Sequence, residues 1–235
     1  MTIDIWSDIM CPFCYIGKRK LEKALEQFPH KDSVNIVWHS FQLDPTMEAN
    51  PGTDIYSYLS ERKGISKERA IQMHKQLTET ARLEGLTYNF NQSILANSFD
   101  AHRLIQMAKT KELGDAAEER IFKAYFTEGK NISDPETLVQ LGTEIGLESG
   151  AIKDILNSDA FESDVTNDIE QAQAYGINGV PFFVLNNKYG ISGAQPSEVF
   201  LNGLTQAWSE YAEEHKVSDM GIASGAACTT DGNCK

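Results

Sequence analysis

Apolar side chains gather in four short runs, and the stretch between the second and third runs has a helical pattern instead. Runs rich in β-branched and aromatic residues are typical of buried strands. They predict strands at residues 2–10, 34–43, 179–185 and 189–193. Apolar residues at helical spacing predict helices at residues 15–28 and 196–215. The chain therefore starts with a strand, a helix and a strand, an order that favours a parallel pair with a right-handed crossover.

The middle of the chain, from residue 51 to about residue 175, has a helical pattern throughout. Its apolar stripes are Ala70, Met73, Leu77 and Ala81, then Ala101, Leu104, Ile105 and Ala108, then Ala117, Ile121, Ala124 and Tyr125, then Leu138, Leu141 and Ile145. We therefore predict an α/β fold with a large all-α insertion between the second and third strands. One discontinuous domain would comprise residues 1–48 and 176–216, and the insertion would be a lid domain at residues 49–175. Residues 217–235 would form a flexible C-terminal tail.

A cysteine motif, Cys11-Pro12-Phe13-Cys14, lies between the first predicted strand and the first predicted helix. A thiolate is the form of cysteine that attacks disulfides, and the first turn of a helix offers it backbone N–H groups and the positive end of the helix dipole. Pro12 suits the first helical position, where a missing N–H costs nothing. We expect Cys11 to be exposed near the N-cap and to attack, and Cys14, one turn deeper, to resolve the mixed disulfide. This arrangement is typical of a thioredoxin-like fold.

Composition narrows the class of protein. The formal net charge of −13 argues against binding to nucleic acid or to an anionic membrane, because both are polyanions. The sequence has no apolar run of about 18 residues, so we expect no membrane-spanning helix. The N-terminal residues lack the basic and apolar regions of a secretory signal peptide, which favours a cytoplasmic protein. In that reducing compartment, four cysteines suggest catalysis, sensing or metal binding rather than structural disulfides.

A second feature is Val180-Pro181, where a proline opens a buried strand and suggests a cis bond in a tight turn. Together with the cysteine motif and the helical insertion, it makes the chain resemble the DsbA-like thiol–disulfide oxidoreductases, and among them the FrnE-type branch. The resemblance rests on three stretches, at residues 7–17, 97–103 and 176–184. It implies a thioredoxin-like fold and an enzyme that exchanges disulfides with protein substrates through a mixed disulfide on Cys11.

The same resemblance implies which other residues form the site. Pro181 would be cis and lie against the cysteine pair, and the backbone of Val180 would bind an extended substrate segment. Pro12 and Phe13 would also contact the substrate. Further substrate contacts would come from the edge of the lid, at Asn97 and His102. No cofactor is implied beyond the redox-active disulfide itself, with glutathione as a candidate co-substrate, and the protein would be a monomer or a homodimer.

Two features depart from the pattern of the family. Phe13 stands where well-known periplasmic oxidants carry histidine, and it offers a thiolate neither a hydrogen bond nor a charge. Ile5 stands where thioredoxin-like folds often carry a buried acid, and Asp4 should face the other way. Asp8 is then the carboxylate nearest to the motif. The direction of exchange therefore stays open between oxidation, reduction and isomerisation.

Other functions fit parts of the same sequence. Glutathione-dependent enzymes of the 2-hydroxychromene-2-carboxylate isomerase and kappa-class transferase types share the fold and are similar over residues 97–102, but they tend to carry serine in place of Cys11. A chaperone module without catalysis is a further alternative, which an unreactive Cys11 would favour. His39 and His102 are the histidines that could lie near Cys11, although a structural role is more typical of each.

A second cysteine pair, Cys228 and Cys234, lies near the end of the chain. It could form a loop disulfide that exchanges with Cys11 and Cys14, as a secondary redox pair. All four thiols together would make a tetrahedral zinc site. The gap of five residues between Cys228 and Cys234 is longer than the usual two to about four, so we expect no metal.

Overall fold

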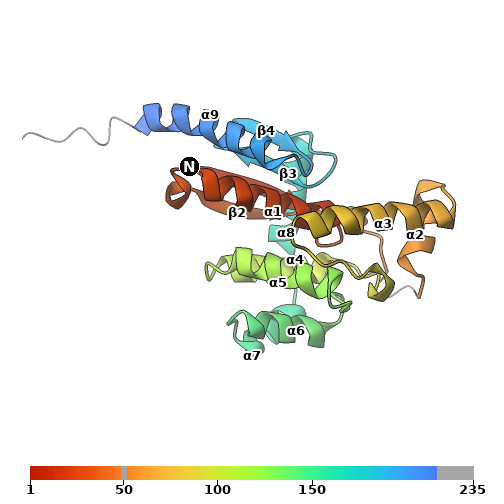
Figure 1. Cartoon of the computed structure of the whole chain (residues 1–235). Helices are drawn as coiled ribbons and strands as arrows, with labels where there is room; N and C mark the ends of the chain where they lie inside the picture. Colours follow the sequence, from red (N-terminus) through yellow and green to blue (C-terminus); the bar gives the residue numbers. More distant parts are fainter. Residues whose placement is uncertain (49–51, 216–235) are drawn as a thin grey trace, which may run out of the picture.

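The protein is described by a computed structural model over residues 1–48 and 52–215, and it has the predicted α/β fold (Figure 1). The sheet has the strand order β2-β1-β3-β4. Its strands are β1 (Thr2–Ser7), β2 (Asn35–Ser40), β3 (Phe182–Leu185) and β4 (Tyr189–Ser192). β1 and β2 are parallel, as the order of elements predicts, whereas β3 runs antiparallel to β1 and to β4.

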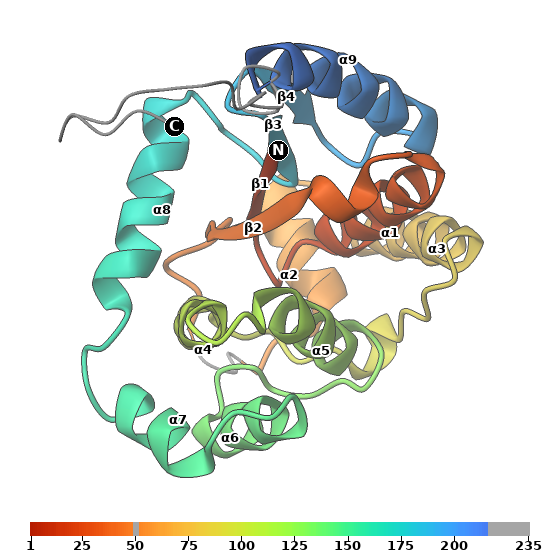
Figure 2. The same cartoon turned by 90° about the vertical axis from the view of Figure 1, so that its left-hand side faces the viewer.

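One face of the sheet is covered by α1 (Pro12–Gln27) and α9 (Ser197–His215), which lie side by side in Figures 1 and 2. Ile3 and Ile5 of β1 are fully buried on this face, because alternate side chains of a strand point to the same side. They belong to a hydrophobic cluster that includes Phe183 of β3 and Phe200 of α9. This packing anchors α1 to the sheet and so fixes the position of the cysteine motif at its start.

The opposite face of the sheet is covered by α8 (Glu162–Ala174), the long helix on the left of Figure 2. Trp6 of β1 points to this side, where it packs with Ala172 and Ile177. Its indole Nε1 donates a hydrogen bond to the backbone oxygen of Asp168 at 3.0 Å. Asp4 also lies on this side, as its position in the strand predicts, and contacts His39 of β2.

The insertion between β2 and β3 is helical, as predicted. Besides α8, its helices are α2 (Ile55–Lys63), α3 (Lys67–Leu83), α4 (Phe99–Lys109), α5 (Gly114–Phe126), α6 (Pro135–Glu144) and α7 (Ser149–Leu156). Helix α3 packs beside α1, α4 and α5 lie below the sheet, and α6 and α7 lie below them (Figures 1 and 2). Asp134 caps α6 by accepting a hydrogen bond from the Thr137 N–H, with Pro135 at the first helical position.

Several element boundaries differ from the prediction. The first strand ends at Ser7 rather than at residue 10, because the next residues form a turn closed by a hydrogen bond from the Cys11 N–H to the Asp8 oxygen, 2.9 Å long. The first helix accordingly begins at Pro12 rather than at residue 15, and β3 begins at Phe182 rather than at residue 179. The cysteines therefore sit in the turn and first helical turn that connect β1 to α1.

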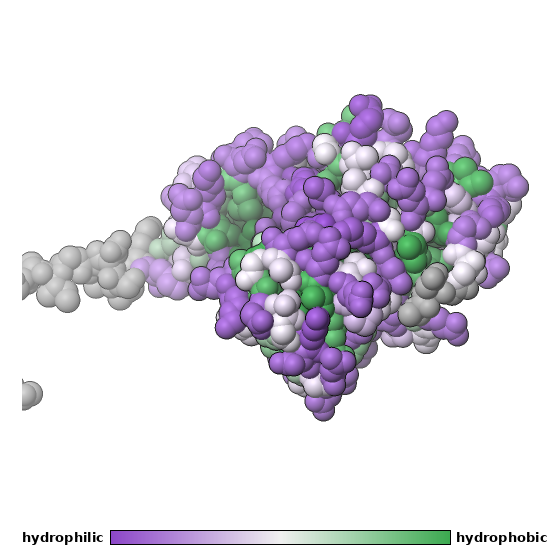
Figure 3. Space-filling model, turned by 90° about the horizontal axis from the view of Figure 1, so that it is seen from below, coloured by the Kyte–Doolittle hydropathy of each residue, from purple (hydrophilic) through white to green (hydrophobic). Residues whose placement is uncertain are grey.

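The face of the molecule that is seen from below in Figure 3 is mostly hydrophilic, with scattered apolar patches. No helix within residues 1–48 and 52–215 has both the length and the apolar character needed to cross a membrane. The division into a discontinuous domain, a lid and a tail stays a prediction. The tail, at residues 217–235, lies outside the described residues.

Candidate active site

The motif places both thiols at the N-terminus of α1. Cys11 is the N-cap residue, with extended backbone angles (φ −89°, ψ 109°), and Pro12 is the first helical residue. The Cys14 N–H donates a hydrogen bond to the Cys11 oxygen at 3.0 Å, which holds the two residues in one turn. Both cysteines are free thiols. The Cys11 thiol donates a hydrogen bond to the Val180 backbone oxygen, with an Sγ to oxygen distance of 3.4 Å.

The two thiols have different surroundings. Burial raises the pKa of the Cys14 thiol well above its ordinary value, and the neighbouring Cys11 thiol raises it further. The Asp8 backbone N–H and the Ser7 hydroxyl, which lie beside Cys14, act in the opposite direction. Cys14 is therefore held as a neutral thiol. This state suits the residue that resolves a mixed disulfide better than the residue that starts the exchange.

The expectation that Cys11 is exposed is wrong for the structure described here, in which only 4% of this residue is exposed. The Cys11 thiol does not face open solvent, because the insertion packs around this part of α1. Cys11 and Cys14 belong to the same hydrophobic cluster as buried side chains of α3, α4 and α5, and Met10 and Val180 pack against that cluster. Phe13 is the exposed residue of the motif, at 49%.

Pro181 lies directly against α1. The Val180–Pro181 peptide bond is cis, and Pro181 is buried. A Cβ atom added at Gly17 would come within 3.0 Å of the Pro181 ring and within 3.1 Å of the Phe183 ring. Such distances are too short for ordinary packing, so glycine at position 17 lets α1 approach Pro181. This approach brings the Cys11 thiol to the carbonyl of Val180.

Asn97 and His102, placed by the resemblance at the border of a cleft, have other surroundings. The Asn97 side chain donates a hydrogen bond to the Met47 oxygen at 2.8 Å and accepts one from the Gln42 amide at 3.0 Å, so it holds the segment after β2. His102 is fully buried, with its Nε2 atom 3.6 Å from a carboxylate oxygen of Asp8. It therefore lies behind the motif rather than on an open surface.

Tyr88, which the sequence analysis did not single out, connects the insertion to the motif. Its hydroxyl donates a hydrogen bond to the Pro12 oxygen at 2.7 Å. Burial raises its pKa, and the two cysteines add to the effect, so its hydroxyl stays protonated. No sequence signal marks Tyr88, because it lies in an irregular segment between α3 and α4.

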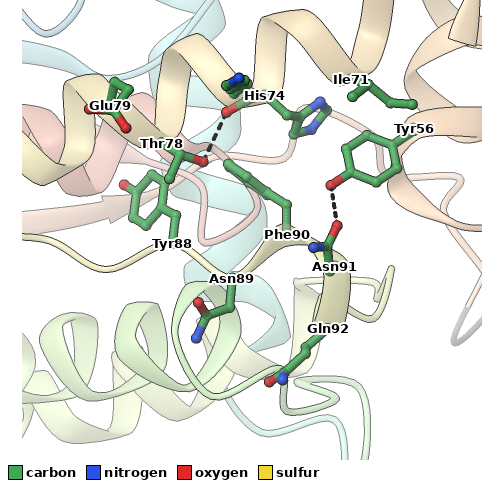
Figure 4. Close-up of a pocket in the computed structure, with 11 residues that line it drawn as sticks. Tyr56, Ile71, His74, Thr78, Glu79, Tyr88, Asn89, Phe90, Asn91 and Gln92 are labelled. Carbon is green, nitrogen blue, oxygen red and sulfur yellow. Dashed lines mark hydrogen bonds between the residues drawn. The ribbon is translucent and has the colours of Figure 1, made fainter. Parts of the chain in front are cut away.

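Tyr88 also lines a pocket of about 430 Å³ between this segment and α3 (Figure 4). Helix α3 contributes His74 and Thr78 to the wall, and the irregular segment contributes Phe90. The pocket residues are Tyr56, Ile71, His74, Lys75, Thr78, Glu79, Tyr88, Asn89, Phe90, Asn91 and Gln92. Its wall and the cysteine motif therefore share one aromatic side chain.

The second cysteine pair, Cys228 and Cys234, lies outside the described residues, so its predicted redox role stays a prediction. Within the described part of the chain, no group of three or more histidine, cysteine, aspartate or glutamate side chains is arranged to hold a metal ion. His39 lies on the face of the sheet covered by α8, between Asp4 and Asp168. It therefore has the structural role that the sequence analysis favoured.

Comparisons with known proteins show which family the chain resembles over nearly its whole length. A profile of the DSBA-like thioredoxin domain family matches residues 2–205. A crystal structure from Streptomyces coelicolor, described as a probable DsbA oxidoreductase, has a TM-score of 0.86 and 37% identity, covering 100% of this chain and 98% of that one. The Bacillus subtilis (strain 168) protein YwbO, described as uncharacterized, is 28% identical over 205 residues, which are 86% of this chain and 95% of YwbO.

A more distant structure shares the fold alone. The cytosolic disulfide reductase DsbM of Pseudomonas aeruginosa, in a structure with glutathione, has a TM-score of 0.61 and 16% identity. The match covers 92% of this chain and 100% of DsbM. The helical insertion is therefore included in the shared architecture.

Proposed function

Since the chain belongs to the DSBA-like thioredoxin domain family, we propose that it is a thiol–disulfide oxidoreductase that acts on protein substrates through Cys11 and Cys14. The observation that carries this proposal is the pair of free thiols at the start of α1, with the Cys11 sulfur 3.4 Å from the Val180 oxygen. In this position Cys11 has the helix N-terminus to stabilise negative charge, while Cys14 remains neutral.

The exchange proceeds in two steps that balance in electrons and protons. The Cys11 thiolate attacks one sulfur of a substrate disulfide, forms a mixed disulfide and releases the other sulfur as a thiolate, which takes a proton from solvent. Cys14 then attacks the Cys11 sulfur. Its proton passes to the second departing substrate sulfur, and Cys11 and Cys14 become a disulfide. Two electrons have then moved from the protein to the substrate, and the reverse sequence oxidises a substrate dithiol.

The substrate is held by backbone and apolar contacts around Cys11. In the reduced protein the Val180 carbonyl accepts the Cys11 thiol hydrogen bond, and in the complex it would accept one from an extended substrate segment. Phe13 is half exposed beside the thiol and offers an apolar contact, with Pro12 next to it. Asn97, which binds the segment after β2, is proposed as a more distant contact for an extended substrate.

The cellular setting follows from the same proposal. The likeness to a cytosolic disulfide reductase supports a cytoplasmic enzyme that reduces or isomerises disulfides. We place it in the FrnE-type branch because of its residues 7–17, 97–103 and 176–184. The proposed enzyme has no resident cofactor, and protein thiols or glutathione would supply the electrons.

The test is the reduction of insulin by the wild type and by Cys11→Ser and Cys14→Ser. We expect wild-type turnover with a dithiol donor, none with Cys11→Ser, and a trapped mixed disulfide with Cys14→Ser. Alkylation of Cys11 followed against pH reports its thiolate. An inert Cys11 together with absent insulin reduction would contradict the proposal and favour a chaperone module.

A glutathione-dependent isomerase or transferase is the second candidate. The observation that favours it is the 4% exposure of Cys11, which suits a small thiol better than a folded protein. The presence of Cys14 favours disulfide exchange, because a conjugating or isomerising enzyme has no need of a resolving thiol. Turnover of 2-hydroxychromene-2-carboxylate with glutathione, undiminished in Cys14→Ser, would decide for this candidate.

A further inference from the structure

Asp8 connects the cysteine turn to the buried interior behind it. The Asp8 side chain is fully buried, and its two carboxylate oxygens accept hydrogen bonds from the Met10 N–H at 3.1 Å and the Leu43 N–H at 2.7 Å. The backbone of the same residue serves both cysteines, because its oxygen accepts the Cys11 N–H and its N–H faces the Cys14 thiol. The backbone of Asp8 therefore fixes the turn that holds both thiols, and its carboxylate lies in the same turn.

His102 of α4 is the histidine that faces Asp8. Its Nε2 atom lies 3.6 Å from Asp8 Oδ1, within ion-pair range but beyond hydrogen-bond length. The imidazole is fully buried, and within the described residues neither ring nitrogen makes a hydrogen bond. A buried polar ring without partners is costly. A small rotation of the His102 ring would bring Nε2 within hydrogen-bond distance of Asp8 Oδ1. Apolar packing alone therefore does not explain a histidine at this position.

The other titratable groups facing Asp8 carry no positive charge. Burial raises the pKa of Glu118 on α5 to about 8, and the Asp115 and Asp8 carboxylates add to the effect, while Lys18 opposes it. Glu118 is therefore protonated at neutral pH. Burial likewise raises the pKa of Tyr125 on α5.

The nearby cations are occupied elsewhere. Lys18 of α1 forms salt bridges with Glu22 and Asp115. Lys109 of α4 lies 3.9 Å from Asp168. Among the side chains that the structure places around Asp8, His102 is therefore the one within ion-pair range that can take up a proton and pair with this carboxylate.

We propose that His102 is the counter-charge of Asp8 and a positioning residue for thiolate formation at the cysteine pair. The proposal rests on the proposed exchange reaction. An unpaired buried carboxylate would oppose a second negative charge on Cys14 when that thiol attacks the mixed disulfide. A positive charge on His102, within ion-pair range of Asp8 Oδ1, would offset this repulsion. His102 acts through Asp8 and touches no reacting atom. The pair Asp8 and His102 would replace the buried acid that thioredoxin-like folds often carry at the position of Ile5.

The experiment measures resolution of a mixed disulfide preformed on Cys11 with a synthetic peptide thiol, by rapid acid quench and mass spectrometry between pH 5 and about pH 9. In His102→Gln we expect resolution at pH 7 to slow about tenfold, the effect of one unit in thiol acidity, and the pH profile to move upward. The double variant Asp8→Asn/His102→Gln should recover most of the rate, because no carboxylate is left unpaired. Glu118→Gln is the matched control and should resolve at the wild-type rate at pH 7, since it replaces a neutral group with another.

Folding is monitored separately, because either position could affect stability. Chemical unfolding of the wild type, both single variants and the double variant gives the coupling between Asp8 and His102 without any exchange reaction. We expect the double variant to lose less stability than the sum of the single variants. A wild-type pH profile in His102→Gln, or a double variant as slow as the single one, would overturn the inference. Absence of exchange in the wild type itself would instead show that the proposed function has failed.

Discussion

At the scale of single residues, the two cysteines differ although they lie in one turn. Cys11 has the helix N-terminus and the Val180 carbonyl as neighbours, whereas Cys14 is enclosed by apolar side chains that keep it neutral. The sequence predicted the position of Cys14, because the spacing in Cys11-Pro12-Phe13-Cys14 places the second thiol one turn deeper. It could not predict the burial of Cys11, which depends on how an insertion distant in sequence packs over α1.

Tyr88 gives a residue-scale prediction. Tyr88→Phe removes the hydrogen bond to the Pro12 oxygen, and we expect the free energy of unfolding to fall by about 1 kcal/mol. Cys11 should also react faster with iodoacetamide, because the irregular segment is held less firmly against the motif. Urea unfolding and timed alkylation measure the two effects.

The matched control for Tyr88 is Tyr125→Phe. Tyr125 is equally buried, but among the described residues its hydroxyl makes no hydrogen bond to the motif. The control should leave Cys11 alkylation unchanged. Equal alkylation rates in Tyr88→Phe and the wild type would show that Tyr88 does not restrict access to Cys11.

At the scale of elements, α8 is attached to the sheet by a charged contact as well as by apolar packing. His39 of β2 lies between two carboxylates, with Nδ1 at 2.7 Å from Asp168 and Nε2 at 2.8 Å from Asp4, and its ring stacks on Trp6. Asp168 also accepts a hydrogen bond from the Ser40 N–H of β2 at 2.8 Å. This contact joins the last helix of the insertion to β2, which precedes the insertion.

The stability contributed by the contact of His39 with Asp168 and Asp4 should change with pH in a direction that the pKa shifts predict. Burial alone would lower the pKa of His39, but the hydrogen bonds to Asp168 and Asp4 outweigh it and the net shift is upward. A raised pKa means that the stabilisation is complete below the ordinary histidine value of 6.5 and is lost as pH rises through the folded-state pKa. The pKa of Asp168 is lowered despite burial, mainly by His39. Its contribution is therefore present above its ordinary value of 3.8 and is lost in acid.

His39→Asn should therefore destabilise the protein by about 2 kcal/mol at pH 6, and by clearly less at pH 9. Urea unfolding at the two pH values measures the difference, and amide exchange locates it in α8. His30→Asn is the control, because His30 is exposed and stacks on Trp208, and it should change stability by less than about 0.5 kcal/mol. The same penalty for His39→Asn at both pH values would mean that hydrogen bonding, not charge, holds α8.

The elements were predictable from the sequence to different degrees. The run of β-branched and apolar residues identified β1, and the apolar stripe with Leu138 and Leu141 identified α6. The ends of elements were less predictable. The turn that ends β1 is closed by a backbone hydrogen bond from the Cys11 N–H to the Asp8 oxygen, and the pattern of apolar side chains carries no information about such a bond. The antiparallel pairing of β3 with β1 was not predicted, because the side-chain pattern of a strand does not say which other strand lies beside it.

At the scale of the whole molecule, the site lies where the sheet layer and the helical insertion meet. Cys11, Cys14 and Pro181 come from the sheet layer, and the motif and Val180 could be predicted from the sequence because each is a short local pattern. Tyr88 comes from the insertion and could not be predicted, because its importance arises only from its hydrogen bond to the start of α1. His102 was identified by resemblance, but its burial behind Asp8 required the fold.

The net charge of −13 leads to a prediction about which small disulfides react fastest. A field of this sign attracts cations and repels anions over a Debye length, which is about 10 Å at 0.1 M salt. The reduced protein should therefore react faster with cationic cystamine than with anionic oxidised glutathione. Each rate is first divided by the rate at which dithiothreitol reduces the same disulfide, which corrects for the intrinsic reactivity of that disulfide. The ratio should fall towards one as salt rises. Neutral 2-hydroxyethyl disulfide serves as the reference that salt should not affect. If oxidised glutathione reacts faster even at low salt, a local binding site must outweigh the overall field, and glutathione rather than a protein would then be the preferred substrate of this active site.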